Sequence, residues 1–182
     1  MAYLTAAVVF FGLLCVLDLV LTFGVIRRLR EMGTEPAMGR ASSDPSHIEA
    51  GAVAARFTAI DVDGLPVTRQ DLTRDHLVAF VSPGCPTCED SLPSLVARAA
   101  ELGPRRILAV VVLDEDKGTD PDAFVAALAP AARVVVTRID DELPRAFGIK
   151  GLPAYVVTGP DGRVAHSDIV LSRTPRPAEV DA

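Results

Sequence analysis

Two cysteines separated by two residues stand between a strand-like and a helix-like segment, and this arrangement constrains the fold most strongly. The run Leu77–Val81 (LVAFV) is wholly apolar, which predicts a short buried strand. After Cys85 and Cys88, apolar residues recur at helical spacing through 89–102, which predicts a helix. Both thiols are therefore expected at a strand-to-helix junction, with Cys85 at the start of the helix.

A sulfur at the first turn of a helix lies where its anion is stabilised. Unpaired backbone N–H groups and the positive end of the helix dipole favour a thiolate there. Pro86, at the start of the helix, has no N–H to leave unpaired. Cys88 lies one turn further on, close enough to attack a mixed disulfide formed by Cys85. We therefore expect Cys85 to be the nucleophile and Cys88 the resolving thiol.

Two other interpretations of the cysteine pair are open. Free cysteines can be inert core residues, and a CxxC pair can be half of a zinc site. Zinc needs two further ligands, and the chain offers only Cys15, His47, His76 and His166, with no second CxxC or closely spaced histidine pair. The strand-to-helix context favours a redox pair. We expect no metal, and without a GxGxxG or P-loop motif no flavin or nucleotide cofactor.

Composition limits the size and the partners of the folded part. A chain of 182 residues with 49% hydrophobic content can bury one ordinary core. The formal net charge of −6 argues against a nucleic-acid partner. Three cysteines are too few for a disulfide scaffold if two of them form the CxxC pair.

The N-terminal segment predicts a membrane anchor. Residues 3–26 are almost wholly apolar, and Asp18 is the only charged residue among them. A helix over this segment would span about 36 Å, which exceeds a hydrocarbon core of about 30 Å. No Lys or Arg precedes the apolar run, unlike the basic start of a cleaved signal peptide. We therefore expect residues 1–30 to be an uncleaved transmembrane helix with a basic flank, contacting the lipid bilayer through 3–26.

The remainder of the chain predicts a linker, an α/β domain and a tail. Residues 31–50 are rich in Gly, Pro and Ser without apolar periodicity, which predicts a flexible linker. Residues 51–171 alternate short strands with helices, which indicates a mainly parallel sheet between helices, closed by an antiparallel hairpin. Residues 172–182 contain two prolines and few apolar residues, and we expect them to be disordered.

With these motifs in place, the chain resembles the thioredoxin superfamily, in particular its bacterial, membrane-anchored TlpA-like branch. Beside the cysteine pair, Pro93 lies five residues after Cys88, where thioredoxins have the proline that kinks the helix. Gly151-Leu152-Pro153 resembles the cis-proline loop of the superfamily. Within the branch, the residues Ser82–Cys88 are closest to the MauD-like proteins of methylamine utilisation. The resemblance implies a thioredoxin-like fold over 51–171, with a central mixed sheet flanked by helices.

The resemblance also implies the residues around the thiols. In the family, the loop before the last hairpin faces the cysteine pair, so the backbone of Leu152 would bind the substrate chain and Pro153 would shape its groove. The residues between and before the cysteines would shape the active site: Pro83, Gly84, Pro86 and Thr87.

Three departures from the family pattern stand out. Gly84 replaces the usual aromatic residue before the first cysteine, and Ala79 stands where thioredoxins have a buried acid. The proton acceptor for Cys88 must then be water, Glu89 or another residue. The usual C-terminal helix is missing or degraded.

The expected function is a membrane-tethered thiol–disulfide oxidoreductase. It would exchange disulfides with thiol- or disulfide-bearing client proteins and be recycled by a redox partner. The resemblance implies a role in maturing extracytoplasmic proteins. A thiol peroxidase is an alternative, but its P-x-x-x-[ST]-x-x-C motif would need Pro where Ala79 stands. The second alternative is a redox-inactive, membrane-tethered binding domain.

The side of the membrane is where the predictions conflict. Arg27, Arg28 and Arg30 follow the apolar segment, and the positive-inside rule then places the rest of the chain in the cytoplasm. The resemblance implies a single-pass protein of the bacterial cytoplasmic membrane whose catalytic domain is extracytoplasmic. We favour the extracytoplasmic location.

Overall fold

In the computed structural model, the chain divides into two units, Met1–Arg40 and Ala41–Ala182. The structure describes residue 12 and residues 48–72, 75–113 and 120–177. The expected anchor, apart from residue 12, and residues 31–47 of the expected linker lie outside the described residues. Among the residues that are described, no helix is long and apolar enough to cross a membrane.

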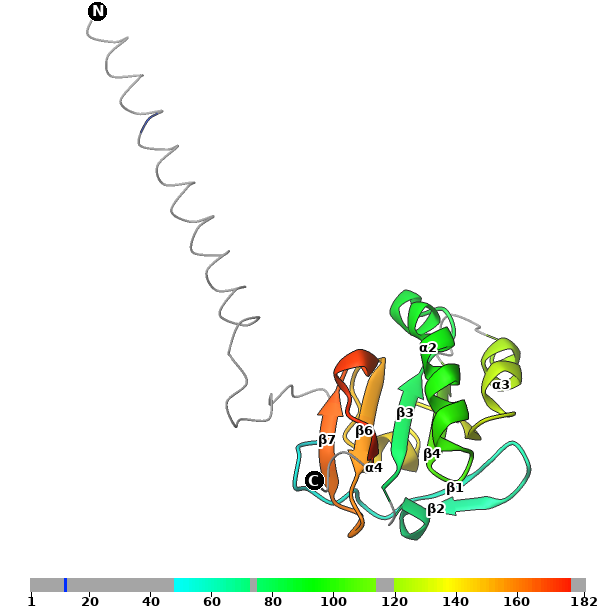
Figure 1. Ribbon diagram of the computed structural model, residues 1–182, viewed down its shortest axis with the longest axis vertical. Coiled ribbons are helices and arrows are strands. Elements are labelled where there is room, and N and C mark those ends of the chain that lie inside the picture. The colour runs from blue at the N-terminus through cyan, green and yellow to red at the C-terminus, as the bar shows by residue number, and fades with distance from the viewer. Residues whose placement is uncertain (1–11, 13–47, 73–74, 114–119, 178–182) are drawn as a thin grey trace, which may run out of the picture. The chain divides into compact units, whose positions relative to one another are not determined.

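The second unit is built around a five-stranded mixed sheet with the strand order β5-β4-β3-β6-β7 (Figure 1). The strands β3, β4 and β5 run parallel, while β6 and β7 are antiparallel, as predicted. The elements are β1 (Thr58–Ile60), β2 (Pro66–Thr68), the 3-10 helix η1 (Arg69–Leu72), β3 (Leu77–Val81), α2 (Pro86–Leu102), β4 (Ile107–Leu113), α3 (Asp122–Leu128), β5 (Arg133–Arg138), α4 (Glu142–Ala146), β6 (Ala154–Thr158), β7 (Val164–Asp168) and the 3-10 helix η3 (Leu171–Arg173).

The central strand β3 fixes where the cysteines lie. All five of its residues are buried, and it pairs with β4 on one side and β6 on the other. A strand covered on both faces needs apolar side chains in both directions, which explains the uninterrupted run from Leu77 to Val81. The chain leaves β3 at its carboxyl end and enters α2 after a short loop. Cys85 and Cys88 therefore lie at the carboxyl end of the central strand.

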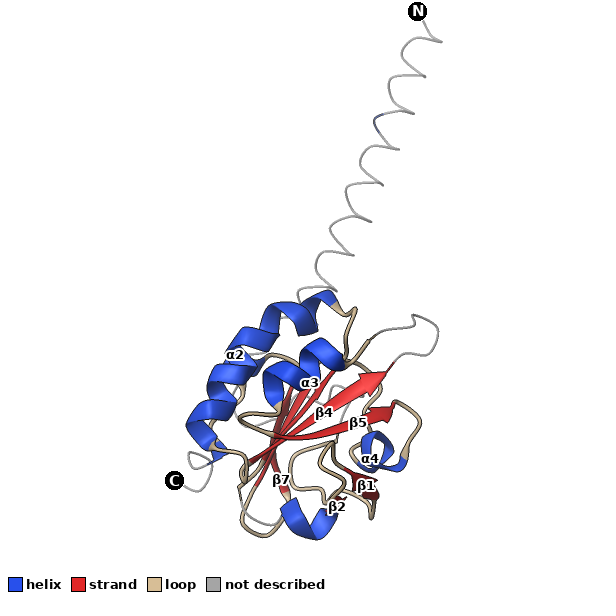
Figure 2. Cartoon of the chain, turned by 90° about the vertical axis from the view of Figure 1, so that its right-hand side faces the viewer, coloured by secondary structure: helices blue, strands red, loops and turns tan. Residues whose placement is uncertain are grey.

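Helices cover the two faces of the sheet unequally (Figure 2). The long helix α2 and the helix α3 lie on one face, while the short helix α4 and the β1-β2 hairpin lie on the other. We call these the α2 face and the α4 face. Each has its own hydrophobic cluster, and alternate residues of β3 point to each, with Ala79 on the α2 face and Phe80 on the α4 face.

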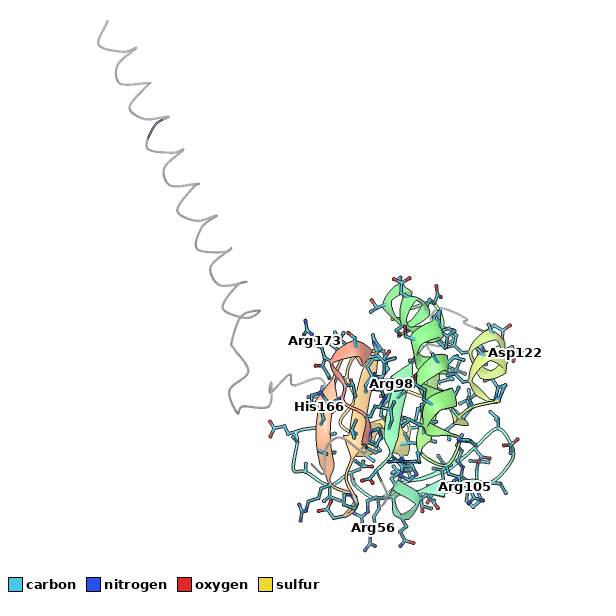
Figure 3. All side chains as sticks on the ribbon, viewed as in Figure 1. Arg56, Arg98, Arg105, Asp122, His166 and Arg173 are labelled. Atoms are coloured by element: carbon cyan, nitrogen blue, oxygen red, sulfur yellow. The ribbon has the colours of Figure 1, made fainter. Side chains whose placement is uncertain are left out.

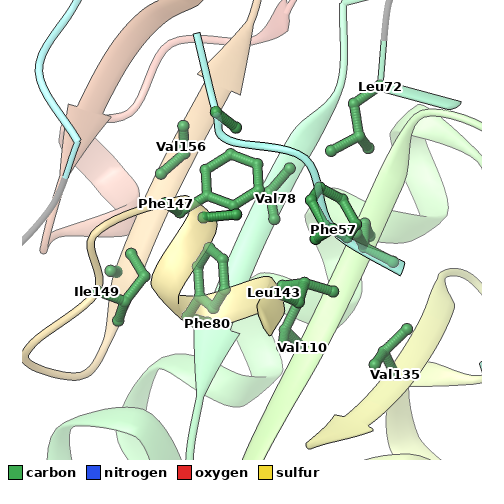
Figure 4. Close-up of a cluster of buried hydrophobic side chains, with 14 of the residues drawn as sticks. Phe57, Leu72, Val78, Phe80, Val110, Val135, Leu143, Phe147, Ile149 and Val156 are labelled. Carbon is green, nitrogen blue, oxygen red and sulfur yellow. The ribbon is translucent and has the colours of Figure 1, made fainter. Parts of the chain in front are cut away.

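Phenylalanine rings fill the α4 face (Figure 4). The ring of Phe147 packs against Phe80 with centroids 5.4 Å apart and against Phe57 with centroids 6.0 Å apart. Both pairs are tilted, as aromatic rings prefer. Since Phe57 precedes β1 and Phe147 follows α4, these contacts hold the opening hairpin and α4 against the sheet.

The domain begins before residue 51, where the linker was expected to end. The backbone N–H of Ile48 donates to the Phe147 carbonyl at 3.0 Å. The side chain of Ile48 packs against the cluster of the α4 face. A single apolar residue has no periodicity, which is why the sequence pattern placed Ile48 in the linker.

The described part of the C-terminal segment also differs from the expected disorder. After β7, η3 buries Leu171 in the α2-face cluster. The Arg98 guanidinium of α2 donates to the Thr174 carbonyl at 2.9 Å, and Arg176 pairs with Glu101 at 3.1 Å. Figure 3 shows Arg98 and Arg173 on this side of the domain. Residues 172–177 therefore lie against α2, because arginines compensate for the low apolar content; 178–182 lie outside the described residues.

Candidate active site

The backbone places Cys85 at the N-cap of α2 and Pro86 in its first turn. The Cys85 carbonyl accepts hydrogen bonds from the backbone N–H groups of Cys88 at 2.9 Å and Glu89 at 3.0 Å. The Cys85 side chain makes no capping hydrogen bond to the helix. This is the strand-to-helix junction that the sequence predicts.

The loop before Cys85 is held by a carboxylate of the helix. Gly84 has a φ of 72°, a left-handed conformation that glycine adopts without steric cost. Its N–H donates to Glu89 Oε1 at 3.0 Å. The aromatic residue that the family has at this position would be strained at this φ, which explains why a glycine stands here. Glu89, considered above as a proton acceptor, is engaged with this loop.

The two sulfurs differ in accessibility. Both cysteines are free thiols; Cys85 is partly exposed, whereas Cys88 has 0% relative exposure. The pKa of Cys88 is raised to about 12, chiefly by burial and also by the hydrogen bond and charge of Cys85, against a backbone hydrogen bond of Ser82 that lowers it. The negative charge of Glu89 also raises it. One thiol is therefore accessible from solvent, and the other is buried and kept protonated.

The loop before β6 brings a carbonyl group to the exposed thiol. The Leu152–Pro153 peptide bond is cis, as the resemblance implied. The Cys85 thiol donates to the Leu152 carbonyl, with 3.9 Å between sulfur and oxygen. Leu152 is half-buried and contacts the clusters of both faces, while Pro153 is buried. Residues 67 positions apart in the sequence thus meet at one point.

The other predicted site residues flank the two cysteines in the sequence. Pro83 is buried, while Gly84, Pro86 and Thr87 are exposed. All six residues predicted beside the cysteines therefore belong to two segments, the β3–α2 loop with the first turn of α2, and the loop before β6. Both segments lie at the same end of the strands, where β3 finishes and β6 begins.

Two residues near the thiols were not predicted. The Tyr155 hydroxyl donates to Ser91 Oγ at 2.8 Å, and Ser91 Oγ donates to the Cys88 carbonyl at 3.0 Å. Burial raises the pKa of Tyr155, the hydrogen bond to Ser91 lowers it, and negative charge on Cys88 or Cys85 raises it. A tyrosine in an otherwise apolar strand was the available signal. Its proximity to Cys88 depends on the pairing of β6 with β3.

The other candidate groups lie elsewhere. A hollow lined by Asp71, His76, Arg105 and Arg133 lies at the opposite end of the strands from the cysteines. Within the described ranges, no group of three His, Cys, Asp or Glu side chains comes together in a way that could hold a metal ion.

Solved structures provide the comparison, since no family model and no curated protein matches the chain. A thio-disulfide isomerase from Thermus thermophilus matches with a TM-score of 0.57 and 22% identity, over 74% of this chain and 94% of that chain. A thiol:disulfide interchange protein DsbE from Chlorobium tepidum, so described provisionally, gives 0.52 and 22%, over 74% and 92%. The thioredoxin domain of a thiol-disulfide oxidoreductase from Bacteroides vulgatus gives 0.52 and 20%, over 65% and 87%.

The fold is thioredoxin-like. The thioredoxin-like domain includes the CxxC junction, the cis-proline loop and the mixed sheet that places them together. At these identities the likeness shows the fold alone, and the chemistry of this chain must be argued from its own site.

Proposed function

We propose that this chain is a thiol–disulfide oxidoreductase in which Cys85 is the nucleophile and Cys88 the resolving thiol. The observation that carries the proposal is the unequal exposure of two free thiols at one helix start. Cys85 is partly exposed and Cys88 is fully buried. The solved structures with the same fold include thiol-disulfide oxidoreductases, which supports the same reading of this pair.

In the first step, the Cys85 thiolate attacks a disulfide of a client protein. A bond forms between the Cys85 sulfur and one client sulfur, the client disulfide breaks, and the other client sulfur leaves as a thiolate. The accessible N-cap position suits this step, because the backbone N–H groups of the first turn favour negative charge there.

In the second step, Cys88 releases the client. The Cys88 sulfur loses its proton and attacks the Cys85 sulfur, so the Cys85–Cys88 disulfide forms and the mixed disulfide breaks. The client leaves with its second thiol, having gained two electrons in total from the pair. Because Cys88 is buried and its pKa is about 12, it resolves the complex without reacting with external disulfides itself. A thiol-bearing redox partner then reduces the pair for another cycle.

The client chain would lie between the two loops that surround Cys85. The Leu152 carbonyl, 3.9 Å from the Cys85 sulfur, is placed to accept a hydrogen bond from the client backbone. Gly84, Pro86 and Thr87 offer an exposed rim with little side-chain bulk, which suits a range of clients.

The proposal includes a bacterial membrane location. Residues 3–26 would tether the domain to the cytoplasmic membrane as a single span, and 31–47 would let it reach clients. The domain would be extracytoplasmic and act on maturing proteins of that compartment, as in the TlpA-like and MauD-like proteins that the sequence resembles. The three arginines after the span oppose this orientation.

Insulin reduction by dithiothreitol tests the chemistry. The wild-type chain should accelerate insulin precipitation, and Cys85→Ser should reduce the rate to that of dithiothreitol alone. Cys15→Ser is the matched control, because it removes the one cysteine outside the pair and should leave the rate unchanged. Equal rates for wild type and Cys85→Ser would reject the oxidoreductase. Peroxide consumption that depends on Cys85, without insulin reduction, would favour the peroxidase alternative.

A reporter fused after Ala182 tests the orientation. Alkaline phosphatase is active only outside the cytoplasm, and a fluorescent protein that folds only in the cytoplasm is the converse reporter. Activity of the phosphatase fusion alone supports the proposed location. Fluorescence alone would place the domain in the cytoplasm, in agreement with the arginines. Release of the chain from membranes by alkaline carbonate would reject the tether itself.

A further inference from the structure

The buried thiol Cys88 lies among groups that offer little help to a developing negative charge. On the α2 face, β4, α3 and η3 contribute apolar side chains to its cluster, represented by Ala109, Phe124 and Leu171. The titratable groups whose charge acts on Cys88 are Cys85 and Glu89, and both oppose its ionisation. A thiolate in such surroundings is costly. Resolution nevertheless requires Cys88 to lose its proton.

Tyr155 is the hydroxyl-bearing member of this cluster. In the register of β6 on β3, Tyr155 lies directly opposite Ala79, and both residues belong to the α2-face cluster. The small alanine side chain leaves room for the ring, which has 0% relative exposure. The ring therefore passes beneath α2 and brings its hydroxyl to the turn of the helix that follows Cys88.

Two hydrogen bonds join Tyr155 to the backbone of Cys88. The Ser91 hydroxyl donates to the Cys88 carbonyl at 3.0 Å and accepts a hydrogen bond from the Tyr155 hydroxyl at 2.8 Å. The direction of both bonds is thereby defined. Pro93 lies inside α2 and cannot donate to the carbonyl of Glu89, four residues earlier. The side-chain link on the neighbouring Cys88 carbonyl therefore supports the first turns of a helix that lacks one backbone hydrogen bond.

We propose that Tyr155, acting through Ser91, is a positioning residue for the resolving step, which holds the Cys88 backbone so that the Cys88 sulfur stays in line with the Cys85 sulfur. This inference rests on the proposed function. In the step it assists, the Cys88 S–H bond and the Cys85–client bond break, the Cys85–Cys88 bond forms, and the proton passes to the departing client sulfur. The Tyr155 hydroxyl lies near enough for charge on either sulfur to raise its pKa.

A single-turnover reaction with a chromogenic aromatic disulfide separates the two steps. The reduced full chain should release one coloured thiolate when Cys85 attacks the reagent and a second when Cys88 resolves the mixed disulfide. In Tyr155→Phe, the second phase should slow by about tenfold at pH 7, and the same rate should need a pH about one unit higher. The first phase should be unchanged.

Matched variants separate positioning from general packing. Ser91→Ala should slow the second phase as Tyr155→Phe does, whereas Ser91→Thr, which keeps a hydroxyl, should restore it. Thr158→Val is the control, because it removes a buried hydroxyl at the other end of β6 that donates to the Leu72 carbonyl. Thr158→Val should leave the rate and pH dependence of both phases unchanged. If Tyr155→Phe fails to fold, as judged by circular dichroism, the two Ser91 variants carry the test.

The outcomes distinguish this inference from the function beneath it. Two phases in the wild type, with the second unaltered in rate and pH dependence by Tyr155→Phe and Ser91→Ala, would overturn the role of Tyr155 and leave the oxidoreductase intact. Equal slowing by Thr158→Val would also overturn it, because the effect would then be one of packing. A wild-type chain that never shows a second phase would overturn both proposals.

Discussion

The two faces of the central sheet receive alternate residues of the same strands, yet their clusters differ in chemistry. On the α4 face, Phe57 and Phe80 pack against Phe147, and the cluster contains no titratable side chain among the residues described. On the α2 face, the cluster contains Cys88 and Tyr155. The comparison indicates that the α4 face contributes packing alone, whereas the α2 face also contains the groups proposed to react.

The composition of the α2 face explains how reactive groups fit beneath a helix. Its cluster includes several alanines, among them Ala79, Ala99 and Ala109. Small side chains let α2 approach the sheet and leave space for the tyrosine ring and the Cys88 sulfur. The α4 face has instead a short helix of five residues, whose position depends on the phenylalanine contacts.

The largest expected effect comes from removing the buried thiol of the α2 face. Cys88→Ser should abolish turnover in the insulin assay and leave Cys85 joined to its client, because nothing remains to resolve the mixed disulfide. Non-reducing electrophoresis should show this complex, and reduction should dissolve it. Cys85→Ser should show no complex. A Cys88→Ser variant that turns over at the wild-type rate would contradict the assigned roles.

The corresponding change on the α4 face should affect stability and not chemistry. Phe147→Ala removes a fully buried ring from contacts with two others and should lower the free energy of unfolding by about 3 to 5 kcal/mol. Urea unfolding measures the loss. The rates of both thiolate-release phases, measured well below the unfolding transition, should match the wild type. Slowed resolution in this variant would show that the two faces are not independent.

The elements that carry the cysteines could be predicted from the sequence. The strand Leu77–Val81 was predicted at the bounds that the structure shows, because a continuous apolar run flanked by turn residues marks a buried strand. The start of the helix was predicted at Cys85 and Pro86, and α2 begins at Pro86, although the apolar periodicity by itself starts only at residue 89. The first turn of a helix carries polar residues and so lacks the apolar periodicity.

What could not be predicted depends on strand register. Nothing local to Tyr155 or Ser91 indicates that they meet, since they are 64 positions apart and the contact requires β6 to pair with β3 so that Tyr155 lies opposite Ala79. The docking of residues 172–177 was missed for a similar reason. The contacts of this segment with α2, from Arg98 to the Thr174 carbonyl and from Arg176 to Glu101, are made through polar atoms, which leave no hydrophobic pattern.

A smaller effect is expected where the opening hairpin joins the rim of the α4 face. Asp61 pairs with Arg133 at 2.6 Å and accepts the Leu65 N–H at 2.7 Å. Burial alone would raise the pKa of Asp61, but these bonds, with that from Asp63, hold it below its ordinary value. Asp61→Asn should lower the free energy of unfolding by about 1 to 3 kcal/mol at pH 7.

The pH dependence of that loss provides its check. A carboxyl whose pKa is lower in the folded state stabilises the fold above about pH 4. This contribution is lost as the pH falls through the folded-state value. The difference between wild type and Asp61→Asn should therefore shrink in acid, as measured by urea unfolding between pH 7 and pH 3. A difference that stays constant over this range would show that packing, and not the charge of Asp61, is responsible.

The smallest expected effect is the contribution of the Cys88 thiol to the free energy of unfolding at alkaline pH. Its pKa is raised in the folded state to about 12, against about 8.5 for an unfolded thiol. The reduced protein therefore keeps the full contribution below about pH 8.5 and loses it as the pH rises toward 12, because the unfolded state then binds fewer protons. Near pH 9.5 the loss should be about 1 kcal/mol.

The oxidised protein has no thiol at this position and should not show this loss. Thermal unfolding of both forms at pH 7.5 and pH 9.5 therefore measures the difference. Parallel losses in the two forms would show that other groups titrate, and that Cys88 is not the protonated thiol of the α2 face.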